Sequence, residues 1–261
     1  MKSFFFFICL FLSVNLYSKH VIVDIAHITD LEPFIEADTL LIFDVGNTLI
    51  EGGTCWGHSQ SIVTAIEESK ARGEDPEEFL KGFAPYWIEA QKFCPGQLIE
   101  GELVPLIRRL QERGIKIMGL THRPVETAAS TLDQLFSVGI DFEKSAPYPD
   151  QIDLPFVPKA RYLEGVIFST YYNNKGTVLQ EFLAYTGLLP TKIVVVDDRS
   201  DKLEDVVLTL SNLGLYVVGL HYLYPEQKPY PWDPATSTIQ RRLQGSFLND
   251  REAAALLEFT P

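Results

Sequence analysis

Acidic residues directly follow two of the most apolar runs in the chain. Asp44 comes after LLIF, and Asp197 and Asp198 come after IVVV. A carboxylate at the mouth of a buried strand is costly unless a metal ion, a lysine or hydrogen bonds compensate its charge. These acids are therefore candidate functional residues, although an aspartate also ends a strand in many proteins without such a role.

A threonine and a lysine occupy comparable places in the pattern. Thr121 follows IKIMGL, and Lys175 opens the helical segment that precedes IVVV. In an open α/β sheet the carboxyl ends of the strands line one crevice where ligands bind. Taken singly, a threonine after a strand is usually a helix N-cap and a lysine is usually a surface charge. Taken together with the acids, they predict one polar site at this edge of the sheet.

The residue two places after Asp44 is a glycine, at a position where a second aspartate often follows such an acid. Gly46 has no side chain that could move a proton, and its neighbour Asn47 can hydrogen-bond but cannot shuttle protons near pH 7. General acid-base assistance is worth about 10²- to 10⁴-fold in rate. If a site built on Asp44 used such assistance, this position would not supply it.

The elements that would position these residues alternate between strand-like and helix-like segments, which favours a mostly parallel α/β sheet. Apolar runs predict at least five strands, and apolar residues at helical spacing predict the helices between them. The expected strands cover 21–26, 40–43, 115–120, 166–168, 193–196 and 215–220, and the expected helices cover 101–113, 125–136, 178–185 and 201–213.

Two segments interrupt this alternation. Residues 51–97 contain two helical patterns and predict a small helical cap, whereas the proline-containing segment 143–164 predicts an irregular loop or a hairpin. The aromatic and proline-rich stretch 222–232 is expected to pack against the outside of the core.

Composition limits the classes of protein that are possible. The 261 residues are 46% hydrophobic and 12% aromatic, enough for one large core and a small accessory domain. The formal charge is -13, from 35 acidic and 22 basic residues, which argues against a nucleic-acid partner. The sequence does not predict the oligomeric state.

The first 18 residues resemble a secretory signal peptide, with Lys2 before the apolar run FFFFICLFL and a polar stretch that ends at Ser18. The run is shorter than the about 20 apolar residues of a membrane-spanning helix. We therefore expect an exported protein, periplasmic or secreted, without a stable membrane span after cleavage; an uncleaved anchor is the alternative. Cleavage would leave Cys55 and Cys94, which form a candidate disulfide in an oxidising compartment and free thiols otherwise.

Four stretches of the chain resemble the motifs of the haloacid dehalogenase (HAD-like) superfamily. They are FDVGNTL (43–49), LTHR (120–123), NNKG (173–176) and VVDDRSDKLEDV (195–206). Longer stretches, such as LTHRPVETAASTLDQLFSVGIDF, resemble an uncharacterised bacterial subgroup with a domain of unknown function. The resemblance implies a Rossmann-like parallel sheet flanked by helices, with the helical cap inserted after the first motif strand. The domains would be a signal peptide (1–18), a HAD-like core (19–50 and 98–261) and the cap (51–97).

The resemblance also implies a Mg²⁺-dependent phosphohydrolase that acts on a small phosphorylated molecule. Asp44 would attack phosphorus to form an aspartyl-phosphate. Thr121 would hydrogen-bond a phosphoryl oxygen, and Lys175 would offset the combined negative charge of Asp44 and the phosphate. The implied ligands of Mg²⁺ are Asp44, the main-chain carbonyl of Gly46, Asp198 and, directly or through water, Asp197. Arg123 and Asn47 are the candidate substrate-binding residues, and the roles of Asp201 and Glu204 stay open because their spacing departs from the commonest pattern.

Gly46 leaves three alternatives open. The first is a weak or specialised phosphohydrolase, which takes its proton from a cap residue such as Glu51 or His58 or needs none. The second is a non-catalytic binding protein that keeps the fold and the metal site. The third is cleavage of a carbon–phosphorus bond through a Schiff base on a cap lysine, for which Lys70, Lys81 and Lys92 are available.

Overall fold

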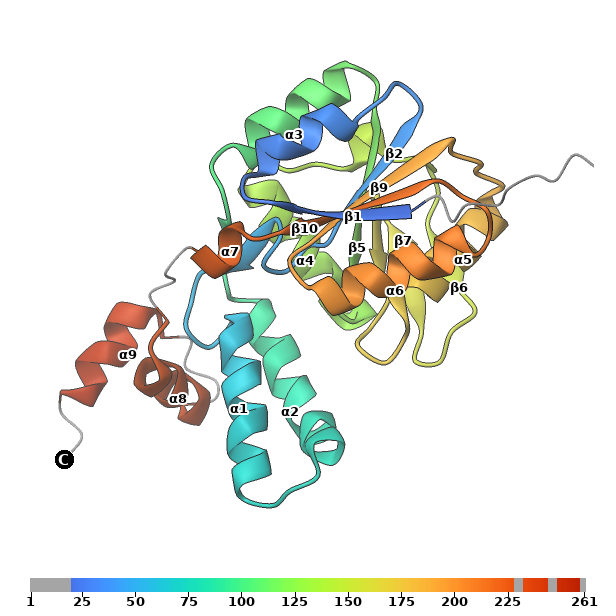
Figure 1. Cartoon of the computed structure of the whole chain (residues 1–261). Coiled ribbons are helices and arrows are strands. Elements are labelled where there is room, and N and C mark those ends of the chain that lie inside the picture. Colours follow the sequence, from blue (N-terminus) through green and yellow to red (C-terminus); the bar gives the residue numbers. More distant parts are fainter. Residues whose placement is uncertain (1–19, 228–231, 244–247, 259–261) are drawn as a thin grey trace, which may run out of the picture.

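The computed structural model describes residues 20–227, 232–243 and 248–258, so the expected signal peptide lies outside the described residues. Its main feature is an eight-stranded sheet in the order β1-β10-β9-β2-β5-β8-β7-β6 (Figure 1). The strands are β1 (His20–Ile25), β2 (Thr39–Phe43), β5 (Lys116–Thr121), β6 (Ile152–Leu154), β7 (Ala160–Leu163), β8 (Val166–Phe168), β9 (Lys192–Asp197) and β10 (Val217–Tyr222). The pairs from β1 to β8 are parallel, and β7 and β6 add an antiparallel hairpin at the edge. The α/β prediction is confirmed, and segment 143–164 forms the hairpin.

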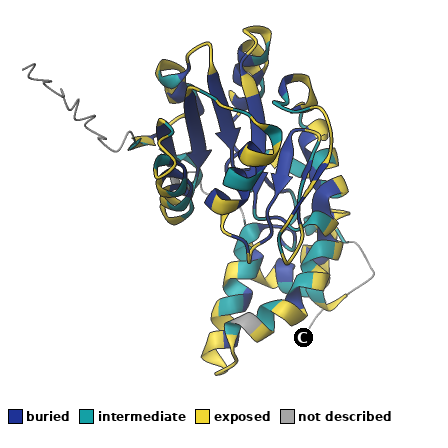
Figure 2. Ribbon diagram, turned by 90° about the vertical axis from the view of Figure 1, so that its right-hand side faces the viewer, coloured by how far each residue is buried: buried dark blue, intermediate teal, exposed yellow. Residues whose placement is uncertain are grey.

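The central strands are buried on both faces because their sequences are continuously apolar. Every residue of β2 and of β9 is buried. Leu41 and Phe43 of β2 pack into one hydrophobic cluster, and Leu40 and Ile42 pack into the other, as the alternation of side chains along a strand requires. Figure 2 shows the central strands of the sheet in the dark blue of buried residues.

Helices cover both faces of this sheet (Figure 1). One face packs against the 3₁₀ segment η1 (Ile28–Phe34), α3 (Leu103–Glu112) and α4 (Ala128–Ser137), which follows the short turn η2 (Val125–Thr127). The other face packs against α5 (Lys175–Thr186) and α6 (Ser200–Ser211). A last 3₁₀ turn, η3 (Glu143–Ser145), leads from α4 towards the edge hairpin.

A pair of helices interrupts the core between β2 and α3. The short strands β3 (Ile50–Gly52) and β4 (Gly96–Leu98) pair antiparallel and form the base from which α1 (Ser59–Ala71) and α2 (Pro76–Gln91) extend away from the sheet (Figure 1). This pair occupies the segment in which the sequence predicts a helical cap, and we call it the cap.

The C-terminal helices lie beside the cap rather than on the sheet. After the short helix α7 (Tyr224–Gln227), α8 (Pro234–Arg242) and α9 (Asp250–Leu257) pack together, and α8 contacts α1 (Figure 1). Tyr222 is buried at the end of β10, but Trp232 donates its indole N–H to the carbonyl of Cys55 at the base of the cap, 3.0 Å away. The end of the 222–232 stretch therefore contacts the cap, which the sequence did not predict. Among the described residues, no helix has both the length and the apolar character needed to cross a membrane.

Candidate functional site

The centre of the candidate site is a buried lysine between two carboxylates. Nζ of Lys175 lies 2.7 Å from Oδ1 of Asp44 and 2.8 Å from Oδ2 of Asp197. All three side chains are almost completely buried. Burial alone would lower the pKa of Lys175, but the charges of Asp197 and Asp44 and their hydrogen bonds raise it. The ammonium is therefore held in its charged form between the two acids.

Asp198 adds a third carboxylate to this cluster. Oxygen atoms of Asp44, Asp197 and Asp198 lie within 4.8 Å of one another. Burial, followed by the charges of Asp44 and Asp197, raises the pKa of Asp198 to about 8. Burial also raises the pKa of Asp44 to about 6, against the opposing effect of Lys175. The cluster holds more negative charge than one lysine can balance, so its residues fit a divalent cation with oxygen ligands.

The sheet places these acids because β2 and β9 are neighbours and end together. The main-chain N–H of Asp44 donates to the carbonyl of Val196, which is the residue before Asp197. Thr48 holds Asp198 in place: Oγ1 of Thr48 lies 3.3 Å from Oδ1 of Asp198 and accepts from its main-chain N–H at 3.2 Å. Thr48 lies within the FDVGNTL motif, but nothing in the sequence predicts its contact with Asp198.

Lys175 reaches the acids from the first turn of α5. The helix begins after Asn174, whose side-chain oxygen accepts from the main-chain N–H of Thr177 at 2.8 Å. Such a cap fixes where the helix starts and so fixes the direction of the lysine side chain.

Thr121 ends β5, the neighbour of β2 on the side away from β9. Its hydroxyl accepts from the main-chain N–H of Arg123 at 3.2 Å, and its carbonyl accepts from both the N–H and the hydroxyl of Ser169. The hydroxyl proton of Thr121 is thus still available to a ligand. The structure therefore places Asp44, Thr121, Asp197 and Asp198 at the ends of neighbouring parallel strands, with Lys175 joining two of them.

Arg123 lies where the core meets the cap. Its Nη1 donates to Oε1 of Gln134 at 2.6 Å and to Oγ1 of Thr131 at 3.1 Å, both on α4. The guanidinium carbon lies 5.9 Å from the centre of the Trp87 ring, on α2 of the cap. Its side chain is buried, and the charges of Glu51 and Asp44 partly offset the lowering of its pKa by burial.

A hydrogen-bonded chain joins the loop after Asp44 to the base of the cap. Asn47, with a left-handed φ of 60°, lies 3.1 Å from the Ser59 hydroxyl through its Oδ1. The same hydroxyl lies 3.1 Å from Oε2 of Glu51, which is 3.6 Å from Nε2 of His58. Nδ1 of His58 accepts from the main-chain N–H of Gln60, so the neutral ring carries its proton on Nε2. Burial lowers the pKa of His58, although the carboxylates of Glu51 and Asp250 oppose the shift.

The structure also shows a site residue that the sequence analysis overlooked. His122 lies between Thr121 and Arg123, and its Nε2 is 3.2 Å from the carbonyl of Asn173, two residues before Lys175. Burial and then the charges of Lys175 and Lys202 lower the pKa of His122 to about 3. The residue was present in the LTHR motif, but nothing in its type alone distinguished it from a surface histidine.

Several other candidates are exposed, unlike the acids of the three-carboxylate cluster. Asp201 is exposed and pairs with Arg199, and Glu204 is exposed on α6. The three cap lysines considered for a Schiff base, Lys70, Lys81 and Lys92, are all exposed.

The disulfide considered from the sequence is not present in the structure, where Cys55 and Cys94 are both buried free thiols. Their sulfur atoms have different partners: Sγ of Cys55 lies 3.4 Å from Oδ2 of Asp250, and Sγ of Cys94 lies 3.3 Å from Oγ1 of Thr54. Burial raises the pKa of the Cys55 thiol to about 11, so this thiol is protonated at neutral pH.

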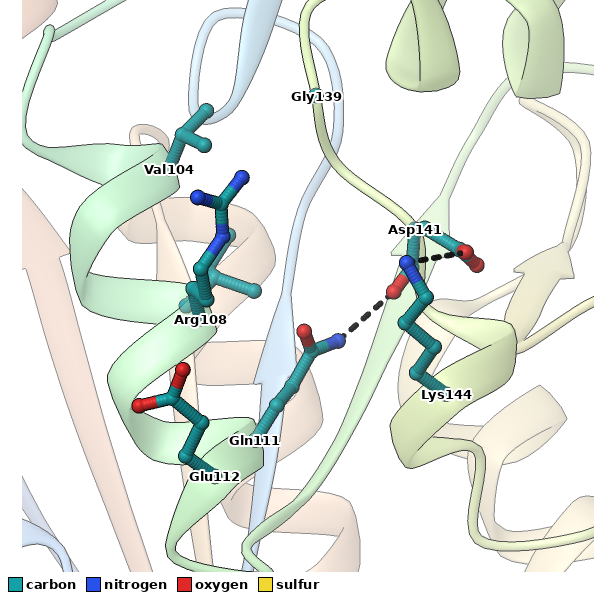
Figure 3. Close-up of a pocket in the computed structure, with 8 residues that line it drawn as sticks. Val104, Arg108, Gln111, Glu112, Gly139, Asp141 and Lys144 are labelled. Carbon is teal, nitrogen blue, oxygen red and sulfur yellow. Dashed lines mark hydrogen bonds and ion pairs between the residues drawn. The ribbon is translucent and has the colours of Figure 1, made fainter.

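A cavity of about 380 Å³ lies elsewhere, between α3 and the segment that follows α4 (Figure 3). Gln111 donates across it to the main-chain carbonyl of Asp141 at 2.7 Å. Its lining contains none of the strand-end residues described above.

Comparisons with known proteins give a family and relatives, but no activity. A protein of Chlamydia pneumoniae named "Putative outer membrane protein" is 28% identical over 98% of both chains. A protein of the same name from Chlamydia trachomatis is 27% identical and covers 85% of this chain and 83% of its own. A haloacid dehalogenase-like family hydrolase of Streptococcus pneumoniae aligns with a TM-score of 0.43 and 12% identity, over 71% of this chain and 95% of that one. A family model described as "Protein of unknown function (DUF2608)" matches residues 21–254, and the chain therefore belongs to this family.

Proposed function

We propose that the protein is an exported, Mg²⁺-dependent phosphohydrolase that acts on small phosphomonoesters through an aspartyl-phosphate on Asp44. The observation that carries the proposal is the Asp44–Lys175–Asp197 arrangement at the ends of neighbouring parallel strands, with Asp198 beside it. Phosphoryl transfer depends mainly on positioning and on the neutralisation of charge. A buried nucleophilic carboxylate, a buried ammonium and two further carboxylates supply the groups that this chemistry needs.

Each residue has a role that follows from its contacts. Lys175 holds Oδ1 of Asp44, which leaves Oδ2 to attack phosphorus and displace the alcohol of the ester. The Thr121 hydroxyl is available to donate to a phosphoryl oxygen, and Asn47 and Arg123 are proposed to bind the substrate. Asp44, Asp198, the carbonyl of Gly46 and Asp197 would hold Mg²⁺, which neutralises phosphoryl charge when it is bound. Water then hydrolyses the acyl-phosphate and releases inorganic phosphate, which restores the Asp44 carboxylate.

The leaving alkoxide needs a proton that Gly46 cannot give. Glu51 and His58 are the nearest candidates along the hydrogen-bonded chain, since Ser59 joins Glu51 to Asn47. Both are held at the base of the cap by other contacts, so substrates whose alcohols leave readily without protonation suit this site best.

Gly46 itself favours one alternative, a binding protein that keeps the metal site but turns over no ester. A protein of this kind would bind phosphate together with Mg²⁺ and release it unchanged. Export is proposed from the N-terminal segment, and the names of the chlamydial relatives support it.

A panel assay tests the proposal. The chain from Lys19 onwards would be incubated with aryl and alkyl phosphomonoesters, with Mg²⁺ or with EDTA, and released phosphate would be measured. We expect Mg²⁺-dependent release from aryl phosphates that Asp44→Asn abolishes. Phosphate binding without any turnover would favour the binding protein, and turnover that survives Asp44→Asn would exclude the mechanism.

A further inference from the structure

Two groups of hydrogen-bond donors at the junction of core and cap have no acceptor among the described residues. The first is the indole Nε1 of Trp87, which is buried and makes no hydrogen bond there. Buried donors are almost always paired in native proteins, so an unpaired one calls for an explanation.

The second group belongs to Arg123, whose side chain is more than nine-tenths buried. Nη1 uses its hydrogens on Thr131 and Gln134, whereas Nε and Nη2 donate to no residue that the structure describes. Among the carboxylates, Glu51 has the largest electrostatic effect on the pKa of Arg123. Glu51 accepts its hydrogen bonds from Gly52 and Ser59, however, and not from Arg123. A buried guanidinium with unused donors is a strong binding site for an anion.

The two groups lie together and next to the candidate site. The guanidinium carbon of Arg123 is 5.9 Å from the centre of the Trp87 ring. The main-chain N–H of Arg123 donates a hydrogen bond to the hydroxyl of Thr121. The charge of Asp44 raises the pKa of the Arg123 guanidinium. A ligand bound at Asp44 could therefore extend towards these donors, which come from the core and from the cap.

We propose that Arg123 and Trp87 form a second anion-binding subsite, which receives an acidic group on the leaving-group side of the substrate. The substrates would be small phosphomonoesters that carry a carboxylate or a second phosphate on the alcohol. This inference rests on the proposed function, because it takes the phosphoryl site at Asp44 as its reference point. The cap would then take part in recognising the charge of the substrate.

The experiment measures binding without turnover. Isothermal titration with Mg²⁺ would compare ethyl-, propyl- and butylphosphonate with phosphonoacetate, 3-phosphonopropionate and 4-phosphonobutyrate, and with bisphosphonates of the same lengths. In the wild type we expect at least one ligand with a second anion to bind about 10-fold more tightly than its alkyl counterpart, as a hydrogen bond to a charged group allows. The acidic group is a carboxylate if the carboxylated phosphonates gain more affinity, and a second phosphate if the bisphosphonates gain more.

Trp87→Phe removes the indole N–H and keeps a ring beneath Arg123. This variant should lose most of the preference for the second anion, while Trp56→Phe, the same change elsewhere in the cap, should keep it. A readout that does not depend on affinity is the ¹H–¹⁵N signal of the indole. The Trp87 signal, identified by its absence in Trp87→Phe, should move downfield on adding the preferred ligand and not on adding its alkyl counterpart.

Two outcomes would overturn the inference, and they are distinguishable. Equal affinities of the wild type for alkylphosphonates and their acidic counterparts would exclude the subsite and leave the proposed function standing. Failure of every phosphonate to bind with Mg²⁺ would exclude both.

Discussion

At the scale of single residues, the site is defined by an imbalance of buried charge. The ammonium of Lys175 pairs with the carboxylates of Asp44 and Asp197, and the carboxyl group of Asp198 lies beside these two acids. Burial and the neighbouring acids raise the pKa of Asp198 to about 8, which favours the protonated carboxyl when no cation is bound. A bound divalent cation would favour the ionised form and displace that proton.

Gly46→Asp is expected to restore the missing acid. A Cβ at this position would meet no atom within 4 Å, and the glycine has no left-handed backbone that a side chain would strain. Turnover of alkyl phosphates should rise by about 10²-fold, and turnover of aryl phosphates much less, because a poor leaving group depends most on protonation. Steady-state kinetics with matched aryl and alkyl esters would measure the change.

Asp44→Asn in the Gly46→Asp background provides the control and should abolish both activities. If the wild type already hydrolysed alkyl phosphates rapidly, another residue would supply the proton, and Glu51 and His58 would be the first to replace.

His122 makes the fold sensitive to acid. Its pKa is lowered to about 3 on folding, so between about pH 6.5 and pH 3 the unfolded chain binds a proton that the folded chain does not. The free energy of unfolding therefore falls as the pH falls, by up to about 1.4 kcal/mol per pH unit from this group. His122→Asn removes this contribution, so between pH 7 and pH 5 the wild type should lose up to about 2 kcal/mol more stability than the variant. Urea unfolding at the two pH values measures this, and equal losses would contradict the assignment.

Most of the site residues could be chosen from the sequence because each ends a strand or begins a helix. Asp44 follows the apolar run LLIF, and Asp197 follows the apolar run IVVV. Such runs predict buried parallel strands, so both acids could be placed at the same edge of the sheet. His122 and Thr48 could not be chosen in this way, since their roles depend on contacts with Asn173 and Asp198 far along the chain. Arg123 was predicted to bind the substrate. Its packing against Trp87 of the cap could not be predicted from the spacing of residues in the sequence.

At the scale of elements, α8 and α9 hold the linker that joins β3 to α1. The main-chain N–H of Cys55 donates to Oδ1 of Asp250 at 2.9 Å, and that of Trp56 donates to Oε1 of Gln240 at 2.8 Å. The Gln240 side chain also donates to Asp250, at 2.9 Å, so the two helices act on the linker as one unit. Their position fixes the base of the cap.

Asp250→Ala should loosen this linker without unfolding the core. The change leaves the part-buried N–H of Cys55 without its acceptor, which typically costs about 1–3 kcal/mol and would speed local opening by about 10- to 100-fold. Hydrogen exchange of peptides that contain Cys55 and Trp56 would show faster labelling. Arg251→Ala, at the exposed neighbouring position, should leave labelling at the wild-type rate. Equal labelling in both variants would mean that the C-terminal helices do not hold the cap.

The strands and helices of the core followed from apolar runs and helical spacing, but the position of α8 and α9 did not. The alternation of Leu40 and Leu41 between the two hydrophobic clusters is a property of the strand itself. The bond between Gln240 and Trp56 joins residues 184 positions apart, and no local pattern indicates it.

At the scale of the whole molecule, a formal charge of -13 makes any cation attractive, so a specific Mg²⁺ site must be distinguished from general screening. A ligand that binds only the folded chain stabilises it by mass action, by about 2.7 kcal/mol at a concentration of 100 times its Kd. We expect the melting temperature of the wild type to rise with Mg²⁺ at constant ionic strength. Asp198→Asn should lose this rise, while Asp153→Asn, which changes a surface acid paired with Lys159 and Arg161, should retain it. An equal rise in both variants would mean that Mg²⁺ acts through the net charge alone.

The contact between Cys55 and Asp250 also limits the order in which the parts of the chain can fold. These residues are 195 positions apart, so the linker of the cap meets its partner only after Asp250 has been synthesised. Contacts of such long separation form late because closing the intervening loop is entropically unfavourable. The strands β2, β9 and β10 can pair without α8 and α9, whereas the linker of the cap needs Asp250 for its final contacts. We therefore expect the strand-end acids to be in place before α8 and α9 fix the base of the cap.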